Sequence, residues 1–351
     1  MFNPHANNQI FVSTDNKVFD ISTLVDSIQH ATVLEGQAGK LTFQMQKNPT
    51  PEVPLNIKNG SVIQFKRDNK GIFFGYVFNM GMDANGIIQV TAYDQMRYLK
   101  NEDTVYISNM KVSDVFNMLC TNHNLKNFKV VTPCDFVCPN KKYEGQTLFS
   151  ILQHQMHQAN IASKGTKYYY IRDNFGTLEF TELHQTKTDI MIGYKSLLSS
   201  FQFEISIDKN TYNSIKVVKS YNSEDEKGKK SDNKIISPYT AKDSNTQRKW
   251  GFLQKVISVD DKMNSAQLIQ YADDYMKSFN RETKTLKLSA LGVDEINAGS
   301  GFSVYIPELN TYKLDDKGQA NDKYLDMWAV GANHTYSRDM HTMELDVATP
   351  F

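Results

Sequence analysis

The 351-residue sequence has no excess of either charge and no long apolar run. Lys plus Arg and Asp plus Glu both number 39, so the formal net charge is zero. Proteins that bind duplex nucleic acid normally carry a basic excess that displaces counterions, and we therefore expect no nucleic acid as the main partner. No stretch of 18 consecutive apolar residues occurs, so we expect neither a transmembrane helix nor stable insertion in a membrane.

The first twelve residues, MFNPHANNQIFV, lack a basic segment followed by an apolar run, so no secretory signal is expected. We therefore expect the chain to be made in the cytoplasm. Its three cysteines are an odd number and poor material for a disulfide framework.

Motifs of catalysis are also missing. The sequence has no G-x-S-x-G elbow, no P-loop and no dinucleotide fingerprint, so we expect no enzyme and no cofactor. Cleavage of peptidoglycan would need a carboxylate pair or a Cys–His pair. Because 39 acidic residues guarantee chance pairs, their abundance decides nothing.

The cysteines offer a weak candidate for zinc. Cys134 and Cys138 form a single C-x-x-x-C, with Cys120 and His123 upstream. Structural zinc sites need two ligand pairs at similar spacing, which this arrangement lacks. We therefore interpret the cysteines as small buried thiols and expect no metal site.

Two pairs of histidines were considered as ligands. His154 and His157 lie three residues apart on a predicted helix and so share a face. No H-E-x-x-H pattern accompanies them, which favours solvated or capping histidines. His334 and His341 flank a predicted hairpin turn, so both are expected at the surface.

Three consecutive tyrosines, 168 to 170, could form a platform for carbohydrate. In a strand, Tyr168 and Tyr170 share one face and Tyr169 lies on the other. Aromatic packing within a sheet is the simpler interpretation.

Alternating apolar residues and turns of the form D-x-x-G predict an antiparallel, mainly β protein. Asp begins such a turn and Gly ends it, because the Asp side chain bonds nearby N–H groups and Gly accepts φ > 0. The turns begin at Asp68, Asp83, Asp173 and Asp315.

The periodicity predicts three sections. Residues 1–97 read as a first β-barrel domain, 98–200 as an α+β domain, and 201–351 as a second β-barrel domain. The middle section contains amphipathic helices, from Val112 to Leu119 and from Leu148 to Ala159 with Thr147 as N-cap. In the last section we expect a helix at 264–279, opened by a capping box, and a mobile loop at 222–249, which is too polar to order itself.

Two segments share one pattern. Gly60–Tyr93 and Gly301–Val347 each read as Gly, strand, turn, strand containing a Gly, turn and alternating strand. Gly75 and Gly331 lie inside the middle strands, where a Gly often marks a bulge or bend. A duplicated barrel and two convergent meanders explain this pattern equally well.

Several short motifs, in order, resemble the XkdQ/YqbQ family of phage-like elements. They are Leu24–Ile28 before Gly39–Phe43, Thr91–Asp94 with Arg97–Leu99, the helix at Lys111–Cys120, Asn213–Val217, Ala266–Tyr275, Leu291–Gly292, and Val330–His334 before His341–Leu345. Each motif alone is weak, but together they span most of the chain.

This resemblance, which extends to the hub part of type VI secretion spike proteins, implies a structural hub of a contractile tail. It implies a homotrimer with two similar small antiparallel barrels per chain, which adapts a hexameric tail tube to a trimeric spike in a baseplate. The partners so implied are the tube, spike, tape measure and wedge proteins. The alternative is a tail-associated protein that binds or hydrolyses peptidoglycan. A receptor-binding fibre is disfavoured because long repeats are missing.

Overall fold

The computed structural model describes residues 7–47, 56–163, 166–194, 196–208, 210–224, 230–259, 264–310 and 324–348. The chain divides into two compact units. The first combines Met1–Gln202 with Leu286–Pro350, and the second is Phe203–Thr285. Because their relative placement is not determined, each unit is described by itself.

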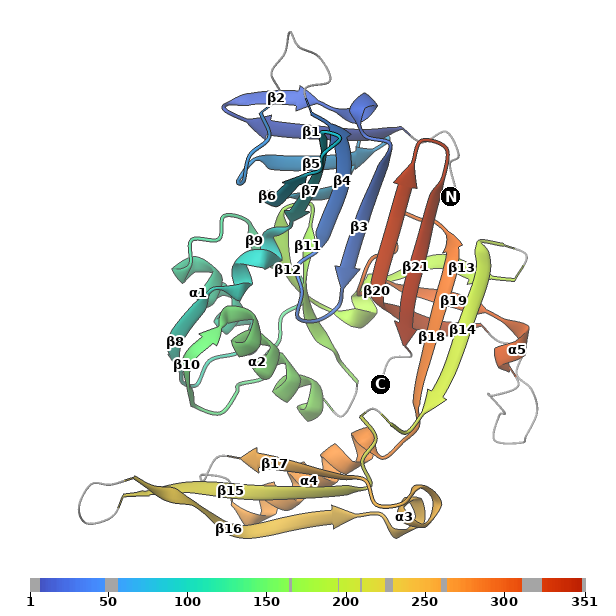
Figure 1. The fold of residues 1–351 in the computed structure, drawn as a ribbon. Coiled ribbons are helices and arrows are strands. Elements are labelled where there is room, and N and C mark those ends of the chain that lie inside the picture. The colour runs from blue at the N-terminus through green and yellow to red at the C-terminus, as the bar shows by residue number, and fades with distance from the viewer. Residues whose placement is uncertain are drawn as a thin grey trace. The chain divides into compact units, whose positions relative to one another are not determined.

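Unit 1 is built on a 13-stranded sheet, which confirms the mainly β prediction (Figure 1). Its N-terminal strands are β1 (Asn8–Thr14), β2 (Lys17–Asp20), β3 (Ser27–Val33), β4 (Lys40–Gln46), β5 (Val62–Arg67), β6 (Lys70–Met82) and β7 (Ile87–Tyr93). Its later strands are β13 (Lys187–Gly193), β14 (Leu198–Ser206), β18 (Thr283–Leu291), β19 (Gly301–Tyr305), β20 (Leu325–Ser337) and β21 (His341–Ala348). Alternate side chains of β4 and β18 are buried, as their sequence pattern predicts.

The sheet consists of two halves with the same strand order. The N-terminal half runs β3-β4-β7-β6-β5, and the later half runs β14-β18-β21-β20-β19. The predicted echo between Gly60–Tyr93 and Gly301–Val347 is therefore confirmed as two meanders of equal connectivity. The outer neighbours differ, because β1 pairs with β5 antiparallel whereas β13 pairs with β19 parallel.

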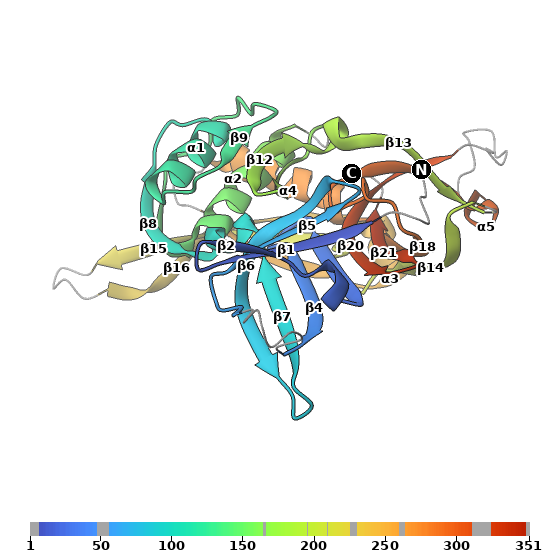
Figure 2. The ribbon, with the colours of Figure 1, turned by 90° about the horizontal axis from the view of Figure 1, so that it is seen from above.

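The halves share backbone hydrogen bonds. Strand β3 pairs antiparallel with β20 from Ser27↔Ser337 to Val33↔Gly331, and Figure 1 shows the two strands side by side. Figure 2 shows the fold from above. The two strand-rich sections thus meet in one sheet, although the middle section separates them in sequence.

A bulge fixes how the halves align. Strand β6 shifts register against β7 between Val77 and Asn79, and β20 shifts against β21 between Ala329 and Gly331. Matching the bulges makes Asn79 the counterpart of Gly331. The prediction that Gly331 marks a bulge is thus confirmed, whereas Gly75 lies four positions before Asn79 and outside the bulge of β6.

Gly75 has a different role. A Cβ atom at this position would lie 2.2 Å from the main-chain oxygen of Tyr93. The backbones of β6 and β7 approach closely here, and only glycine fits. The predicted sharp bend at Gly75 is thus a close approach of two strands.

The middle section forms a compact α+β part of unit 1. It contains β8 (Glu102–Ile107), α1 (Val112–Asn122), β9 (Phe128–Val130), β10 (Lys141–Thr147), α2 (Leu148–Ala162), β11 (Tyr169–Asn174) and β12 (Thr177–Glu182), with short helices η2 (Gln95–Lys100) and η3 (Leu183–Thr186). Both predicted helices are confirmed, and Thr147 Oγ1 accepts from Ser150 N at 3.1 Å as N-cap. Their apolar faces pack in one core that includes Val115, Phe116 and Ile151.

Unit 2 carries a small sheet and one covering helix. Strand β15 (Ser214–Glu224) lies between β16 (Lys230–Lys242) and β17 (Gln254–Val259), and α4 (Ser265–Phe279) packs on Ile215 and Val217. The predicted helix and its capping box, Asn264 with Gln267, are confirmed.

Unit 2 differs from the expectations for residues 201–351 in two respects. In the segment 222–249, which was expected as a mobile loop, residues 230–242 form strand β16 through main-chain pairing with β15, and helix α3 (Ser244–Trp250) begins at Ser244. Residues 203–285 are also grouped as a compact unit, which has a core of its own between Tyr212 and Met276, whereas the prediction assigned them to one barrel domain at 201–351. The predicted turn at Asp315–Gly318 lies outside the described residues.

Candidate functional site

Two strand edges of the main sheet are candidate assembly sites. Strand β14 stands at one end of the strand path, next to β18. Strand β6 pairs with β7 on one side as far as Met82. On its other side it pairs with β5 only as far as Tyr76. Within the described part of the chain, β14 and residues 78–82 of β6 therefore each have a neighbouring strand on one side only, and a strand edge of this kind is a template for another strand.

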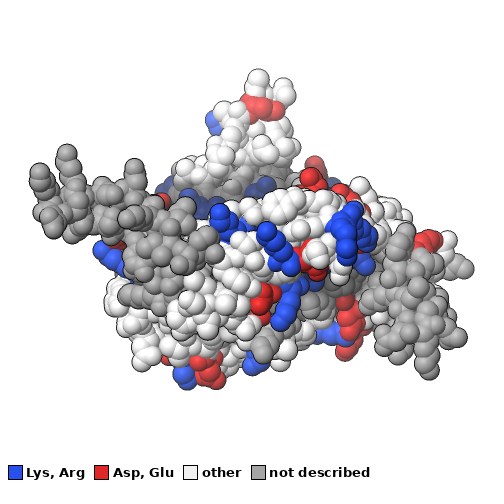
Figure 3. All heavy atoms as spheres, turned by 90° about the horizontal axis from the view of Figure 1, so that it is seen from below, with Lys and Arg blue, Asp and Glu red and all other residues white. Residues whose placement is uncertain are grey.

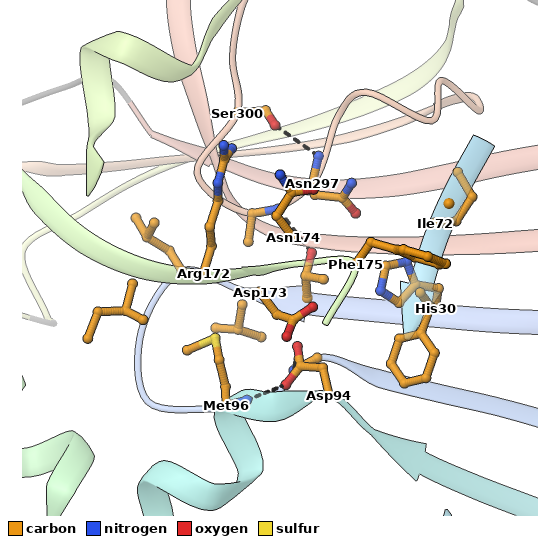
Figure 4. Close-up of a pocket in the computed structure, with 18 of the residues that line it drawn as sticks. His30, Ile72, Asp94, Met96, Arg172, Asp173, Asn174, Phe175, Asn297 and Ser300 are labelled. Atoms are coloured by element: carbon orange, nitrogen blue, oxygen red, sulfur yellow. Dashed lines mark hydrogen bonds between the residues drawn. The ribbon is translucent and has the colours of Figure 1, made fainter. Parts of the chain in front are cut away.

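A polar cavity of about 210 Å³ lies where the β3–β4 connection, η2, β11 and the loop after Asp294 converge. The carboxyl groups of Asp94 and Asp173 point toward one another in it (Figure 4). Asp94 is the N-cap of η2 and accepts from Met96 N at 3.0 Å and Gly39 N at 2.9 Å. Asp173 is the first residue of a predicted D-x-x-G turn.

Asp173 accepts from Gly176 N at 2.7 Å and from Gln95 N at 3.3 Å. Burial raises its pKa to about 7. Burial and the charge of Asp173 raise the pKa of Asp94 well above its ordinary value. The pair therefore retains a proton near neutral pH, because two facing buried carboxylates cannot both ionise cheaply.

The two carboxyl groups hold main-chain segments together. Asp94 ties η2 to the start of β4 through Gly39, where a Cβ atom would lie 2.3 Å from its Oδ2. Asp173 ties the β11–β12 hairpin to η2 through Gln95. The pair thus connects the N-terminal strands to the α+β section. Sequence reasoning missed the pair, because no motif relates two residues that lie 79 positions apart.

A second buried polar group lies at the junction of the sheet halves. His334 Nε2 donates to Ile296 O at 2.7 Å, so its Nδ1 must accept the 2.9 Å hydrogen bond from His341 Nε2. His341 Nδ1 in turn accepts from Arg67 at 2.7 Å, and Arg67 also pairs with Asp294 at 3.3 Å. Each ring is thus held as one neutral tautomer.

Burial is the largest cause of the lowered pKa values of these two histidines. It lowers the pKa of His334 to about 4 and that of His341 to about 2, with nearby Arg67 adding to both. His30, the partner of His334 in the β3·β20 pair, has a pKa lowered to about 3 by burial and by His334. The prediction that His334 and His341 lie at the surface is wrong, because each is only 1% exposed. They point inward from strands whose alternation places them beneath the sheet.

The cysteines are buried thiols, as predicted. Cys120, Cys134 and Cys138 are at most 3% exposed and are all free. Burial raises the pKa of Cys120 and of Cys138 to about 12, so neither is a thiolate at neutral pH. His123 is instead 3.0 Å from Asp103. In the part of the chain that is described, no three His, Cys, Asp or Glu residues are placed to hold a metal.

The remaining candidates have packing roles. His154 bonds Tyr143 Oη at 2.9 Å and is half-buried, whereas His157 is exposed. The interpretation of the tyrosine run as aromatic packing is confirmed for Tyr169, which stacks on Phe180, and for Tyr170, which lies in a core with Trp328.

The surface shows both signs of charge. On the face in Figure 3, basic and acidic side chains occur near one another. Surface pairs such as Lys187–Asp326 and Lys287–Asp346 reflect the balanced composition. Among the described residues, none of the helices has the length and apolar character to span a bilayer.

Comparison with known proteins gives relatives across nearly the whole chain. Phage-like element PBSX protein XkdQ of Bacillus subtilis (strain 168) is 24% identical over 294 residues, which are 83% of this chain and 82% of that protein. The 43 kDa tail protein of prophage MuSo2 from Shewanella oneidensis has a similar fold, with a TM-score of 0.68 at 13% identity over 97% of this chain and 98% of that one.

A third similarity reaches type VI secretion. The E. coli c3393 protein, described as a component of that system with structural similarity to T4 tail proteins gp27 and gp5, matches with a TM-score of 0.50 at 10% identity. It covers 93% of this chain and 73% of that protein. The model of the family described as YQBQ-like matches residues 28–348, and the chain therefore belongs to the YQBQ-like family.

Proposed function

We propose that the chain is a structural hub of a contractile tail or a phage-tail-like particle. In this role it forms a homotrimer in the baseplate and adapts a hexameric tail tube to a trimeric spike. It acts through shape and symmetry, without catalysis, in contact with the tube, spike, tape measure and wedge proteins. Synthesis in a bacterial cytoplasm precedes this assembly.

The observation that carries the proposal is the repeated half-sheet. Each chain presents the order β3-β4-β7-β6-β5 once and the order β14-β18-β21-β20-β19 once. Three chains then present six similar half-sheets, which is the number needed to match a six-fold ring. The family membership and the tail-protein folds among the relatives support the same role.

The test is reconstitution. The mass of the purified chain is measured by light scattering, alone and with the tube protein of the same particle. The chain is then added to tail particles that lack it. The proposal expects three copies per complex and restored assembly. A chain that stays monomeric under both conditions and does not enter particles would refute it.

One observation favours a second candidate, the peptidoglycan hydrolase. Asp94 and Asp173 form a carboxyl pair with raised pKa values in a polar cavity. Such pairs serve acid–base chemistry on glycosides. Both carboxyl groups already accept two main-chain N–H bonds, which favours a structural role. Clearing of purified cell wall by the wild type, lost in Asp173→Asn, would favour the hydrolase.

A further inference from the structure

The cavity that contains Asp94 and Asp173 is rich in hydrogen-bond acceptors with unused capacity. Each of the four carboxyl oxygens accepts one main-chain N–H bond, although a carboxylate oxygen can accept two hydrogen bonds. Asn297 also lines the cavity, and its Oδ1 is buried without a hydrogen-bond partner. The cavity therefore favours a ligand that brings hydrogen-bond donors or positive charge.

A buried imidazole reaches the same cavity from β3. His30 is only 4% exposed, and its Nδ1 has no hydrogen-bond partner. Figure 4 shows the His30 ring directed into the cavity in which the two carboxyl groups face each other. Because a buried polar atom without a partner destabilises the fold, such an atom beside a cavity indicates a site for a bound partner.

The basic side chains that line the cavity are paired with other carboxylates. Arg172 bonds Glu179 at 2.8 Å, and Lys70 bonds Glu295 at 2.6 Å. Among the described residues, no Lys or Arg forms an ion pair with either of the two facing carboxyl groups. The charge of the pair is therefore not neutralised from within the described chain.

The volume of the cavity suits an ion that keeps part of its water shell. About 10 to 15 Å³ of such volume holds one water molecule, so 210 Å³ accommodates an ion and several waters. Mg²⁺ and Ca²⁺ take oxygen ligands, and Mg²⁺ commonly binds through one or two carboxylates while keeping waters. Two carboxylates also match the charge of a divalent ion. Such a site needs no third protein ligand, in agreement with the finding that no three candidate ligands converge in the described chain.

We propose that this cavity binds one hydrated divalent cation, Mg²⁺ or Ca²⁺, with Asp94 and Asp173 as its two protein ligands. Waters on the ion donate hydrogen bonds to Asn297 Oδ1 and His30 Nδ1. In binding, the ion displaces the proton that the two carboxyl groups otherwise share. Asp94 bonds Gly39 just before β4, and Asp173 lies in the β11–β12 hairpin. The ion thus clamps the N-terminal strands to the α+β section.

The probe for this site is Tb³⁺, whose emission rises when a nearby tyrosine transfers excitation to it. Tyr170 is buried and lines the cavity, so it can act as the donor. The full chain is stripped with EDTA and titrated with Tb³⁺ at pH 7.5, where protons compete weakly. Bound Tb³⁺ is then displaced with the chlorides of calcium, magnesium, sodium or methylammonium. The proposal expects one strong site per chain, which Ca²⁺ or Mg²⁺ empties and neither monovalent cation does.

Four variants locate the site. Asp173→Asn and Asp94→Asn each remove one anionic ligand and should raise the Kd for Ca²⁺ by at least about tenfold, since even changes to groups that merely bond a metal ligand cost that much. The matched control Asp83→Asn changes an exposed aspartate of another D-x-x-G turn and should leave the Kd unchanged. Tyr170→Phe should also keep the Kd but lower the sensitised emission, because it removes the donor and not a ligand.

A wild type that binds no Tb³⁺, or releases it equally to methylammonium, would overturn the proposal. Asp173→Asn and Asp94→Asn proteins that fold, by tryptophan fluorescence, and bind as tightly as the control would overturn it too. Where both variants fail to fold, Tyr170→Phe decides: lower emission at unchanged Kd supports the site, and undiminished emission contradicts it. None of these outcomes depends on the number of copies in a particle, so the hub proposal stands or falls separately.

Discussion

Asp173→Asn is predicted to change how stability depends on pH. In the wild type, burial raises the pKa of Asp173 from its ordinary value of 3.8 to about 7. Between these values the folded state holds a proton that the unfolded state has released. Stability therefore falls as pH rises, by roughly 2 kcal/mol from pH 5 to pH 7, because the folded state has lost half of this proton at pH 7.

Asparagine at position 173 removes this proton from the folded state. Its side-chain oxygen can keep the 2.7 Å bond from Gly176 N, and its amide can donate to Asp94. The weaker 3.3 Å bond from Gln95 N is lost. The stability of the variant relative to the wild type should therefore rise by roughly 2 kcal/mol across that interval. The buried histidines contribute a pH dependence of opposite sign to the stability. This contribution is the same in both proteins, so it disappears when the stability of the wild type is subtracted from that of the variant.

The assay is urea unfolding at several pH values, followed by tryptophan fluorescence. The sequence has two tryptophans, Trp250 and Trp328. Trp328 is buried in unit 1, so a Trp250→Phe background reports unit 1 alone. The control is Asp83→Asn, an exposed turn aspartate of the same D-x-x-G form. It should shift stability by a constant amount. Parallel pH profiles for Asp173→Asn and the wild type would refute the buried pair.

Three further changes test the fold. His30→Phe removes a ring whose pKa in the folded state is about 3. As pH falls, the unfolded wild type takes up a proton at this histidine before the folded state does, so its free energy of unfolding drops by about 2 kcal/mol by pH 5. The variant should not show this drop in urea unfolding. Gly75→Ala should prevent the close approach of β6 and β7 and lower the free energy of unfolding by several kcal/mol. Gly81→Ala, whose added Cβ atom meets nothing within 4 Å, should leave the unfolding temperature in thermal melts unchanged. Leu268→Ala should destabilise unit 2 by about 2 to 5 kcal/mol, seen as faster proteolysis there, with the Trp328 transition unchanged.

Periodicity was sufficient for the local elements. The helices at Val112 and Leu148, the capping box at Asn264 and the repeated meander follow from residue spacing, which the structure reproduces. Such patterns report which side chains face a core. They do not report which strands meet, and so the joining of β3 to β20 was not predicted.

The errors share that physical origin. The polar segment 230–242 was interpreted as a loop, yet main-chain bonds to β15 make it a strand. His334 and His341 were placed outside because they flank a turn, yet a hydrogen-bonded chain to Arg67 allows neutral imidazoles to be buried. The Asp94–Asp173 pair depends on segments that only the folded chain brings together.

The central claim is that three copies of this chain place six similar half-sheets in one ring. Its most direct measurement is an image reconstruction of the assembled tail tip. The account predicts three copies of the chain at the end of the tube, with their six half-sheets arranged in one ring. A tail tip without the chain, or with one or six copies of it, would contradict the account.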